Sequence, residues 1–424
     1  MRKLFFLTVL IICASMLLAA TVSIDLWFHS GRGDEREVLR SQVKSFNEMQ
    51  DLVHVNAVQL PEGSYNQQVQ AAAMADDLPD LLDLDGPYMT NYAWSGFLRP
   101  LDKYVSQHLK NDLLPSIVNQ GTYDGKLYAL GTFDSGLGIY GNKAMLEKVG
   151  ARIPQSVEDA WTREEFMDIL AKLKELPELK YPLDLMLSYT GEWYAYGLSP
   201  IVQAFGGDMI DRSDFMSAEG VLNGEEAVEG MKWLQTLVEK GYVNTNPTND
   251  AALVEEDAAL AWVGHWYYNR ATEALGDDAV ILPMPKLGPE DSKFGGQATG
   301  MGSWCWGITT KSEHPYAAWL FLQYILRPEE ILHMTNANGA VPSRKSASKM
   351  SELYGEGGPL QIFVKQAEQI AVERPVTPAY PVISSAFTKA VKDIIDGANV
   401  KEALDEAVKK IDRDIEDNQG YPTD

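Results

Sequence analysis

The stretch SIDLWFHSGRGDEREVLRSQVKSFNEMQDLVHVNAVQL, residues 23–60, decides the class of fold. Its first segment alternates apolar and polar residues, with Ile24, Leu26 and Phe28 in step, and it ends in a Gly-containing turn. This alternation predicts a half-buried strand. Residues 35–49 follow with apolar side chains at helical spacing, and HVNAVQL then alternates as a second strand. The order strand, helix, strand indicates an α/β unit.

The same alternation continues outward from this unit. YNQQVQAAAMAD reads as a helix, and DLLDLDGP reads as a short strand that Gly86 and Pro87 end. Strands that alternate with helices predict a layered α/β domain with a largely parallel sheet. Beyond it, further helices are predicted over residues 159–176, 227–241, 314–330 and 399–415. Thr162 and Glu165 form a capping box in the first of these, and Asn399 caps the last.

Length and charge narrow the possible functions. A chain of 424 residues is longer than one hydrophobic core usually serves, so two domains or lobes are expected. The formal net charge of -24 repels phosphates and anionic lipid headgroups, which argues against nucleic acid as a partner. It places no restriction on a neutral ligand.

The N-terminus has the pattern of an export signal. Arg2 and Lys3 precede an apolar run from Leu4 to Leu18, and small residues follow it. We expect residues 1–23 to be a cleaved signal peptide and the protein to be periplasmic; an uncleaved membrane anchor is the alternative. The mature chain then holds one cysteine, Cys305, so no intrachain disulfide can form. Neither a metal site nor a cofactor is indicated.

The sequence contains no enzyme motif in the structural context that the motif requires. GLGIYG, residues 136–141, has the spelling of a dinucleotide-binding loop, but its alternating Leu137 and Ile139 predict that it is itself a strand. Patterns typical of serine hydrolases, zinc proteases and P-loop proteins do not occur. His265 has no nucleophile nearby in the sequence. We therefore expect no catalytic residues.

The aromatic residues point instead to a binding site. The chain has 10 Trp and 19 Tyr, many beside Gly, Pro or Asp at expected strand ends. Flat apolar rings beside carboxylates, amides and guanidinium suit a carbohydrate, which has C–H faces to stack and hydroxyls to hydrogen-bond. In VGHWYYNR, helical spacing assigns Tyr267 and Tyr268 to packing, while Trp266 lies on the polar face with Arg270. Trp266→Ala is expected to weaken sugar binding severely and to leave thermal stability nearly intact.

Several blocks, in order, resemble the sugar-binding proteins of ABC importers in the maltose-binding-like group. They are PDLLDLDGPYMTNYAWSGFLRPLDKYV, YDGKLYALGTFDSGLGIYGNKAMLEKVGARIPQSVEDAWTREEF, GEWYAYGLSPIVQAFGGDMI, ALAWVGHWYYNR, GSWCWGITTKSEHPYAAWLFLQYILRPEE and NGAVPSRKSA. The resemblance covers nearly the whole mature chain. It implies an α/β, two-lobe periplasmic binding protein fold of type II, with the ligand in a cleft between the lobes.

The resemblance also implies how the chain is divided. The N-terminal lobe would comprise residues 24–136 and 291–342, and the C-terminal lobe residues 137–290 and 343–424. Crossings between the lobes would fall near 134–140, 290–308 and 335–343. A protein of this kind is a monomer that catalyses no reaction, binds its solute and delivers it to the transmembrane permease subunits. Lobe closure around the ligand would be a hinge motion.

Cleft-facing positions of the family map onto a set of residues in this chain. They are His29, Ser30, Tyr65, Gln68, Asp85, Gly86, Asp134, Ser135, Trp193, Trp262, Gly264, Trp266, Gly302, Trp304 and Arg374. In the expected roles, Asp85 and Asp134 accept from sugar hydroxyls, Trp193 and Trp266 stack, and Arg374 donates.

Two departures from the family's pattern imply a reshaped cleft. Gly141 stands where a tyrosine is common, and Trp304-Cys305-Trp306 is bulkier than usual. The expected ligand is an oligosaccharide. One alternative is an anionic ligand such as a glycerol phosphate ester, for which Arg374 and Arg270 are the evident cations. The other is a secreted glycosidase, which also combines aromatic residues with carboxylates.

Overall fold

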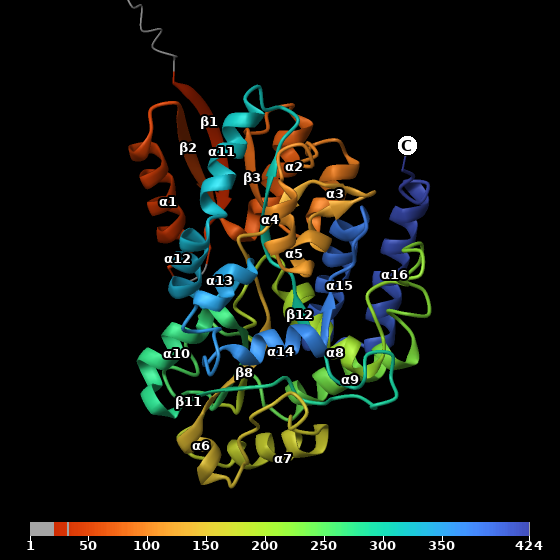
Figure 1. The fold of residues 1–424 in the computed structure, drawn as a ribbon. Coiled ribbons are helices and arrows are strands. Elements are labelled where there is room, and N and C mark those ends of the chain that lie inside the picture. Colours follow the sequence, from red (N-terminus) through yellow and green to blue (C-terminus); the bar gives the residue numbers. More distant parts are fainter. Residues whose placement is uncertain (1–20, 32–33, 424) are drawn as a thin grey trace, which may run out of the picture.

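Two sheets, each covered by helices, organise the chain in a computed structural model that describes residues 21–31 and 34–423 (Figure 1). The first sheet has five strands in the order β2-β1-β3-β13-β6. Its strands are β1 (Val22–His29), β2 (Val53–Leu60), β3 (Leu81–Asp85), β6 (Ala129–Leu130) and β13 (Trp304–Ile308). β1 runs parallel to β2 and β3, whereas β13 is antiparallel to β3 and β6. We call this sheet and its helices the N-terminal lobe.

Both faces of the first sheet are buried under helices. Ile24, Leu26 and Phe28 of β1 share one core with the buried faces of α1 (Glu35–Met49) and α11 (Pro315–Ile325). On the other face, Leu82 and Leu84 of β3 pack with α2 (Tyr65–Met74) and α3 (Tyr88–Trp94). The strand–helix–strand reading of residues 23–60 is confirmed, because the alternating residues of β1 face that core.

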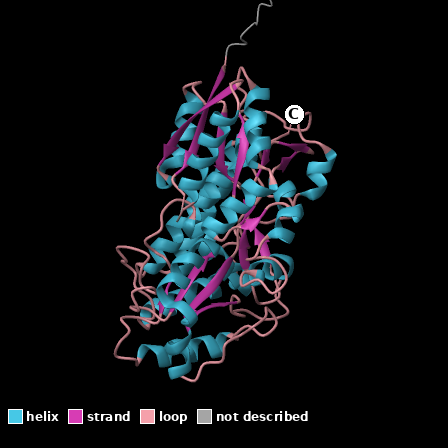
Figure 2. Ribbon diagram, turned by 60° about the vertical axis from the view of Figure 1, so that its left-hand side comes forward, coloured by secondary structure: helices cyan, strands magenta, loops and turns pink. Residues whose placement is uncertain are grey.

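The second sheet has four strands in the order β11-β8-β10-β9. They are β8 (Leu137–Asn142), β9 (Leu183–Asp184), β10 (Leu260–Gly264) and β11 (Ala279–Leu282). Its helices include α6 (Lys143–Lys148), α7 (Arg163–Lys174), α8 (Trp193–Phe205), α9 (Glu225–Glu239), α10 (Tyr268–Leu275), α14 (Gln361–Gln369), α15 (Tyr380–Ile395) and α16 (Val400–Asp417). Figure 2 shows the two groups of strands apart from each other, with helices around each. This second group is the C-terminal lobe.

Short strand pairs lie where the chain passes between the lobes. β7 (Phe133–Asp134) pairs with β14 (Val341–Pro342), and β12 (Thr299–Met301) pairs with β15 (Ala371–Glu373). β7 leads into β8, and β12 leads into β13, so each of these connections is only two residues long. Smaller elements complete the N-terminal lobe: α4 (Gln107–Asp112), α5 (Pro115–Gln120), β4 (Thr122–Tyr123), β5 (Lys126–Leu127), α12 (Pro328–Asn338) and α13 (Lys345–Met350).

Contacts in the structure bear on the expected limits of the leader and of the two lobes. Val22 and Ser23 already belong to β1, so the strand begins inside the expected leader of residues 1–23. Residues 286–297 pack on the C-terminal lobe, with the Lys286 amide donating to the Trp161 carbonyl at 2.8 Å, so the expected boundary at 291 falls within this segment. Ser346 bonds Asp112 of α4, which keeps α13 with the N-terminal lobe.

Other sequence predictions have mixed outcomes. GLGIYG is a strand, as expected, because β8 lies between β10 and β11 with every residue buried. The helix expected from residue 314 does begin at Pro315, but its extension to residue 330 is wrong, because α11 ends at Ile325 and Pro328 begins α12. Residues 1–20, which contain the apolar run of the leader, lie outside the described residues. Across the described ranges, no helix combines the length and apolarity that a bilayer crossing requires.

Candidate functional site

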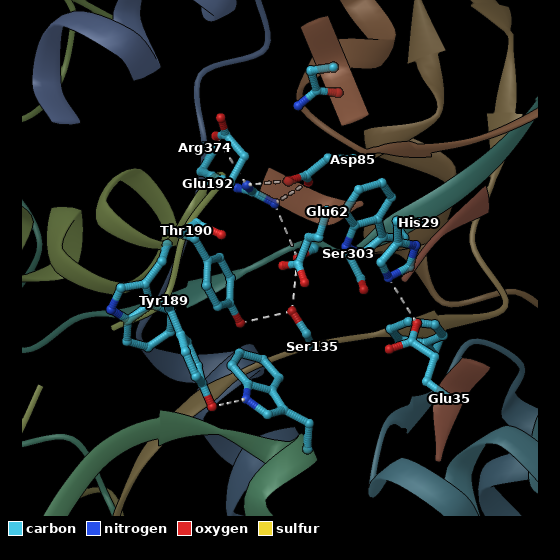
Figure 3. A pocket seen from close by; sticks show the side chains of 18 of the residues that line it. His29, Glu35, Glu62, Asp85, Ser135, Tyr189, Thr190, Glu192, Ser303 and Arg374 are labelled. Carbon is cyan, nitrogen blue, oxygen red and sulfur yellow. Dashed lines mark hydrogen bonds and ion pairs between the residues drawn. The ribbon is translucent and has the colours of Figure 1, made fainter. Parts of the chain in front are cut away.

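A cavity between the two lobes is the candidate site (Figure 3). It encloses about 750 Å³, its open mouth included. Both lobes contribute to its wall, the N-terminal lobe chiefly through β1, β3 and β13 and the C-terminal lobe through α8 and the residues after β10. The lining residues are His29, Glu35, Glu62, Asn66, Asp85, Phe133, Ser135, Tyr189, Thr190, Gly191, Glu192, Trp193, Tyr196, His265, Trp266, Gly302, Ser303, Trp304 and Arg374.

Four aromatic rings form the wall on the C-terminal lobe. Trp193 and Tyr196 lie three residues apart in the first turn of α8 and so share one face. Tyr189 meets the Trp193 ring edge-on at 5.1 Å, and Trp266 meets it edge-on at 6.2 Å. We call these four residues the aromatic wall. Perpendicular packing of this kind holds the rings in place and leaves faces open to the cavity.

Two glycines make room for the indoles of the aromatic wall. A Cβ on Gly197 would lie 2.8 Å from the Trp193 ring, and one on Gly264 would lie 2.2 Å from the Trp266 ring. Gly264 was expected among the ligand contacts, but it does not line the cavity. It ends β10, and its missing side chain is what allows Trp266 to fold back over the strand end.

The N-terminal lobe contributes a second stacked surface. The imidazole of His29, at the end of β1, lies parallel to the Trp304 indole, with centroids 3.6 Å apart and planes 5° apart. Tyr65 meets the same indole edge-on at 5.3 Å. Tyr65 is fully buried and donates to the Trp27 carbonyl, so it supports Trp304 from behind and does not line the cavity.

His29 is held by two carboxylates. Its Nδ1 lies 2.5 Å from Asp83 of β3, and its Nε2 lies 3.3 Å from Glu35 of α1. Burial alone lowers the pKa of His29, but the charges of Asp83 and Glu35 more than offset it and raise the pKa well above its usual value. The two carboxylates thus favour the protonated imidazole, and they hold it at both nitrogens.

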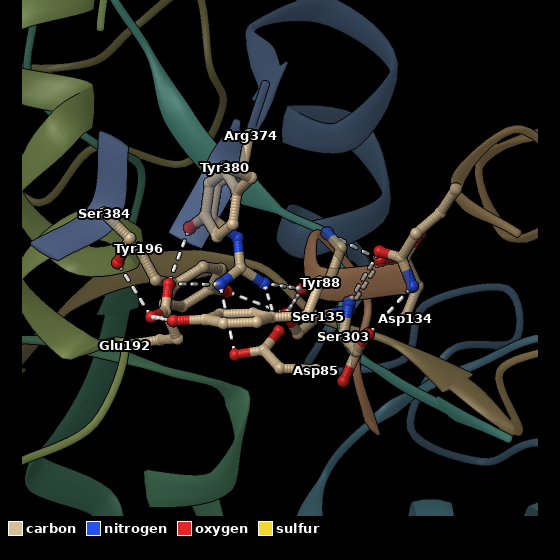
Figure 4. Close-up of polar contacts among 12 residues, drawn as sticks. Asp85, Tyr88, Asp134, Ser135, Glu192, Tyr196, Ser303, Arg374, Tyr380 and Ser384 are labelled. Carbon is tan, nitrogen blue, oxygen red and sulfur yellow. Dashed lines mark hydrogen bonds and ion pairs between the residues drawn. The ribbon is translucent and has the colours of Figure 1, made fainter. Parts of the chain in front are cut away.

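Arg374 joins carboxylates from both lobes (Figure 4). It forms a two-pronged pair with Asp85, at 2.8 and 3.3 Å, where β3 of the N-terminal lobe ends. It also lies 3.6 Å from Glu192, the residue before α8 of the C-terminal lobe. Burial, and then the charge of Asp85, raise the pKa of Glu192. The expected roles of Asp85 as acceptor and Arg374 as donor toward a sugar are thus modified, because the two already bind each other.

Three hydroxyl groups complete the surroundings of Glu192. It accepts from Tyr88 at 2.9 Å, from Tyr380 at 2.6 Å and from Ser384 at 2.7 Å. Tyr88 belongs to α3 of the N-terminal lobe, whereas Tyr380 and Ser384 belong to α15. Glu192 is therefore a bridging point between the lobes at the wall of the cavity.

The residues at the crossings are tied to one another. Asp134 accepts from the amides of Ser135 at 2.8 Å and Gly302 at 3.1 Å, which links two of the crossing segments. The Ser135 hydroxyl bonds both Tyr196 and the Gly302 carbonyl at 2.8 Å. Asp134 itself is buried behind the wall, and burial raises its pKa. Ser135 and Gly302 do line the cavity.

The structure brings together some of the expected residues and separates the others. Those that line the cavity are His29, Asp85, Ser135, Trp193, Trp266, Gly302, Trp304 and Arg374. Those outside the lining are Ser30, Tyr65, Gln68, Gly86, Asp134, Trp262 and Gly264.

Local bonds explain the residues outside the lining that have not yet been placed. Ser30 accepts from the Glu62 amide, and Gln68 bonds Ser64 one helical turn earlier. Trp262 is buried, and its Nε1 donates to the Gly197 carbonyl. Gly86 packs on Gln120 and lines a smaller cavity that shares Gly302 and Arg374 with this one.

One of the two departures from the family's pattern reaches the cavity and the other does not. Trp304 lines it, but a Cβ on Gly141 would meet Leu146, Leu260 and Val280. The expectation that Gly141 reshapes the cleft is therefore wrong, because its position faces the core of the C-terminal lobe.

Several lining residues were not found from the sequence. They are Glu35, Glu62, Asn66, Phe133, Tyr189, Thr190, Gly191, Glu192, Tyr196, His265 and Ser303. The block GEWYAYG contained a usable signal, because Tyr196 lies three residues after Trp193 and Glu192 directly precedes it. Glu35 and Glu62 could not be found in this way, because the sequence around them resembles that of ordinary solvent-exposed acidic residues.

Comparison with known proteins identifies the family. Residues 41–356 match the model of bacterial extracellular solute-binding proteins, and the chain belongs to this family. It is 24% identical to the maltotriose-binding protein of Pyrococcus abyssi, over 87% of this chain and 77% of that protein. It is 20% identical to the multiple sugar-binding protein of Streptococcus mutans, over 78% of this chain and 76% of that protein.

Solved structures show the same fold. The GacH receptor of Streptomyces glaucescens, studied with acarbose, superposes with a TM-score of 0.77 at 20% identity, over 93% of this chain and 99% of that one. The maltodextrin-binding MalE domain of Bdellovibrio bacteriovorus, bound to maltotriose, gives a TM-score of 0.78 at 19% identity, over 93% and 100% of the two chains. The protein therefore has the two-lobe periplasmic binding protein fold.

Proposed function

We propose that this protein is the substrate-binding component of an ABC importer and that its cavity holds an oligosaccharide of a few units. The observation that carries the proposal is the pair of ring surfaces contributed by the two lobes. The aromatic wall belongs to the C-terminal lobe, and the Trp304–His29 stack belongs to the N-terminal lobe. A sugar has apolar faces that stack on such rings, while its edge hydroxyls bond polar groups between them.

The relatives support this ligand class. Its relatives in sequence include a maltotriose-binding and a multiple sugar-binding protein, and the solved structures with the same fold include one bound to maltotriose. In the proposed cycle, the protein is exported to the periplasm, closes on its ligand as a monomer and releases it to the permease. Closure follows because a ligand that contacts both lobes stabilises the closed state over the open one.

The arrangement of carboxylates favours binding over hydrolysis. A glycosidase requires an acid and a second carboxylate on opposite sides of the scissile bond. In this cavity Asp85 is held by both prongs of Arg374, and Glu192 is surrounded by three hydroxyl donors. These two of the four described lining carboxylates thereby hold the lobes together, which supports our proposal that the protein carries out no reaction.

A thermal-shift screen tests the proposed ligand class. A ligand that binds only the native state raises the Tm, so a panel of mono- and oligosaccharides should contain members that raise it in a concentration-dependent way. Calorimetry on those members then gives the Kd. A panel of neutral, amino and acidic saccharides that leaves the Tm unchanged would contradict the proposal.

Trp266→Ala is the matching variant. The affinity for the sugar is expected to fall by tenfold or more, because one face of the aromatic wall is lost (a stacking contact of about 1 kcal/mol beyond its buried area). Stability should fall too, contrary to the sequence-based expectation, since the half-buried ring packs on Trp193 and His265. Phe294→Ala removes another half-buried ring of the same core outside the cavity, and it should lower the Tm without changing the Kd.

A further inference from the structure

The guanidinium of Arg374 is already neutralised within the cavity wall. It contacts Asp85 through two nitrogens and lies within 3.6 Å of Glu192. All three side chains line the cavity and all are largely buried. Because two carboxylates already surround this one cation, an anionic ligand would find no free cation here.

His29 repeats this arrangement within the N-terminal lobe. Its two nitrogens contact Asp83 and Glu35, so even the protonated ring is outnumbered by carboxylates. A neutral ring would leave the group more negative still. Both cations described in the wall are therefore bound between pairs of acids.

The complete lining has the same balance. Its described acidic residues are Glu35, Glu62, Asp85 and Glu192, against Arg374 and His29. Among the described lining residues, the carboxylates therefore outnumber the cations by four to two. Water is partly excluded from such a cavity, so these charges act more strongly on a ligand than they would on an exposed surface.

His265 supplies a second, independent observation. It lines the cavity and is 2% exposed. Its Nδ1 lies 3.0 Å from the Asn338 carbonyl, which can only accept, so the hydrogen is assigned to Nδ1 and Nε2 carries a lone pair. Nε2 has no hydrogen-bond partner within the described part of the chain. Burial lowers the pKa of His265 to about 4, so at neutral pH this nitrogen accepts from hydroxyl or ammonium hydrogens and repels an anion.

The aromatic rings add to the same preference. Tryptophan and tyrosine faces attract a cation through their quadrupoles, by about 0.5–2 kcal/mol for a ring in a partly desolvated site. Arg374 already lies over the Tyr196 ring at 5.0 Å, which shows that the aromatic wall accommodates a positive group. The cavity thus combines aromatic rings, more carboxylates than cations among its described lining residues, and the unpaired acceptor Nε2 of His265. This combination suits an ammonium group attached to a sugar.

We propose that the cavity selects its ligand by charge: it prefers a saccharide that carries a protonated amine over the neutral sugar, and it rejects saccharides that carry carboxylate or phosphate groups. This inference rests on the proposed function, namely that the cavity holds a saccharide. It also excludes the glycerol phosphate ester that the sequence left open as an alternative ligand.

Calorimetry on a matched set of saccharides tests the selection. The set consists of di- and trisaccharides of glucose, glucosamine and glucuronic acid, compared at equal chain length and linkage in 0.15 M salt. We expect the glucosamine member to bind about threefold or more tighter than the glucose member, and the glucuronic acid member about tenfold or more weaker. An amine that gives no gain, or an acid that binds as tightly as the neutral sugar, would overturn the inference while neutral binding upholds the proposed function. Binding by no member would overturn the proposed function, and the inference with it.

A charge-removing variant assigns the selection to the wall. Glu62→Gln keeps a polar group of the same size in the lining but removes one negative charge, so the ratio of the glucosamine to the glucose affinity should fall about threefold. Glu37→Gln removes the same charge from the exposed surface of α1, where solvent screens it, and should leave the ratio unchanged. An equal ratio in the wild type and the Glu62→Gln variant would show that the wall's charge does not select the ligand.

Discussion

Trp266 is oriented by hydrogen bonds behind it. Its Nε1 donates to the Tyr189 hydroxyl at 3.3 Å, and Tyr189 donates to Asp250 at 3.0 Å. Arg270 holds the other oxygen of Asp250 at 2.7 Å. Asp250 does not line the cavity, so it acts on the ligand only through the two aromatic residues. We regard it as a positioning residue.

Asp250→Ala is expected to weaken ligand binding by roughly three- to tenfold. The loss corresponds to about 1 kcal/mol for the hydrogen bond that fixes Tyr189, and Asp250→Asn should recover part of it because an amide oxygen still accepts. Calorimetry measures both variants. Asp168→Ala removes an exposed carboxylate of α7 and is the control. Equal affinity of the wild type and Asp250→Ala would show that the rings need no such support.

His265 and His29 respond to pH in opposite senses. Burial lowers the pKa of His265 to about 4, so between about pH 6.5 and 4 the unfolded chain binds a proton that the folded chain does not. The contribution of His265 to stability is therefore lost as the pH falls through this window. The pKa of His29 is raised, so its contribution is present below its ordinary pKa and is lost as the pH rises through the folded value.

His265→Gln is expected to reduce the loss of stability in acid. A shift of this size corresponds to on the order of 3 kcal/mol between pH 7 and pH 4, and the variant lacks this titration. Urea unfolding of both proteins at the two pH values gives the difference, and the acidic residues that also titrate contribute equally to both. If both proteins lose the same free energy, His265 is not neutral in the folded state.

At the scale of single elements, a helix could be predicted from the sequence where it has regularly spaced apolar residues or a capping residue of its own. α1 begins and ends at the predicted residues. Its apolar residues recur at helical spacing, and they form the buried face of the helix. Asn399 caps α16 through the Glu402 amide, and Thr162 and Glu165 form both bonds of the capping box of α7. α8 was not predicted as a helix, because it is buried on all sides and contains Pro200, so it shows neither periodicity nor a clear start.

The capping box of α7 gives a prediction at this scale. Thr162→Ala leaves the Glu165 amide without its partner, so the free energy of unfolding should fall by about 1 kcal/mol, whereas Thr162→Ser should restore it. Urea denaturation measures the change. α7 does not reach the cavity, so the Kd should be the same in all three proteins. A loss of affinity together with the loss of stability would indicate that α7 is coupled to the site.

At the scale of the whole molecule, the lobes meet through polar groups at the cavity. The Tyr88 hydroxyl of the N-terminal lobe donates to Glu192 of the C-terminal lobe, and Arg374 joins Glu192 to Asp85. A second contact lies at the C-terminus, where the Trp94 indole of α3 donates to the Pro422 carbonyl at 3.0 Å. These bonds favour the arrangement in which both walls face one ligand.

Tyr88→Phe is expected to weaken binding by roughly tenfold. It removes a hydrogen bond to a charged acceptor, worth about 1.5–3 kcal/mol, so part of the ligand's binding energy must then bring the lobes together. Calorimetry gives the Kd, and small-angle scattering should show a larger radius of gyration without ligand. Tyr316→Phe changes an exposed tyrosine of the N-terminal lobe and should alter neither. An unchanged radius and Kd would show that the bond does not hold the lobes.

Sequence patterns predicted the class of fold, the helices and strands that carry their own periodicity and caps, and the aromatic character of the site. These properties are local, since spacing along the chain settles which side chains share a face. The pairing of Asp85 with Arg374, 289 positions away, could be seen only in the folded protein. The same holds for the position of Glu192 between the lobes and of Tyr65 behind Trp304. The physical reason is that the wall of the cavity consists of contacts between distant segments, and the charge balance of such a wall exists only after the two lobes have come together.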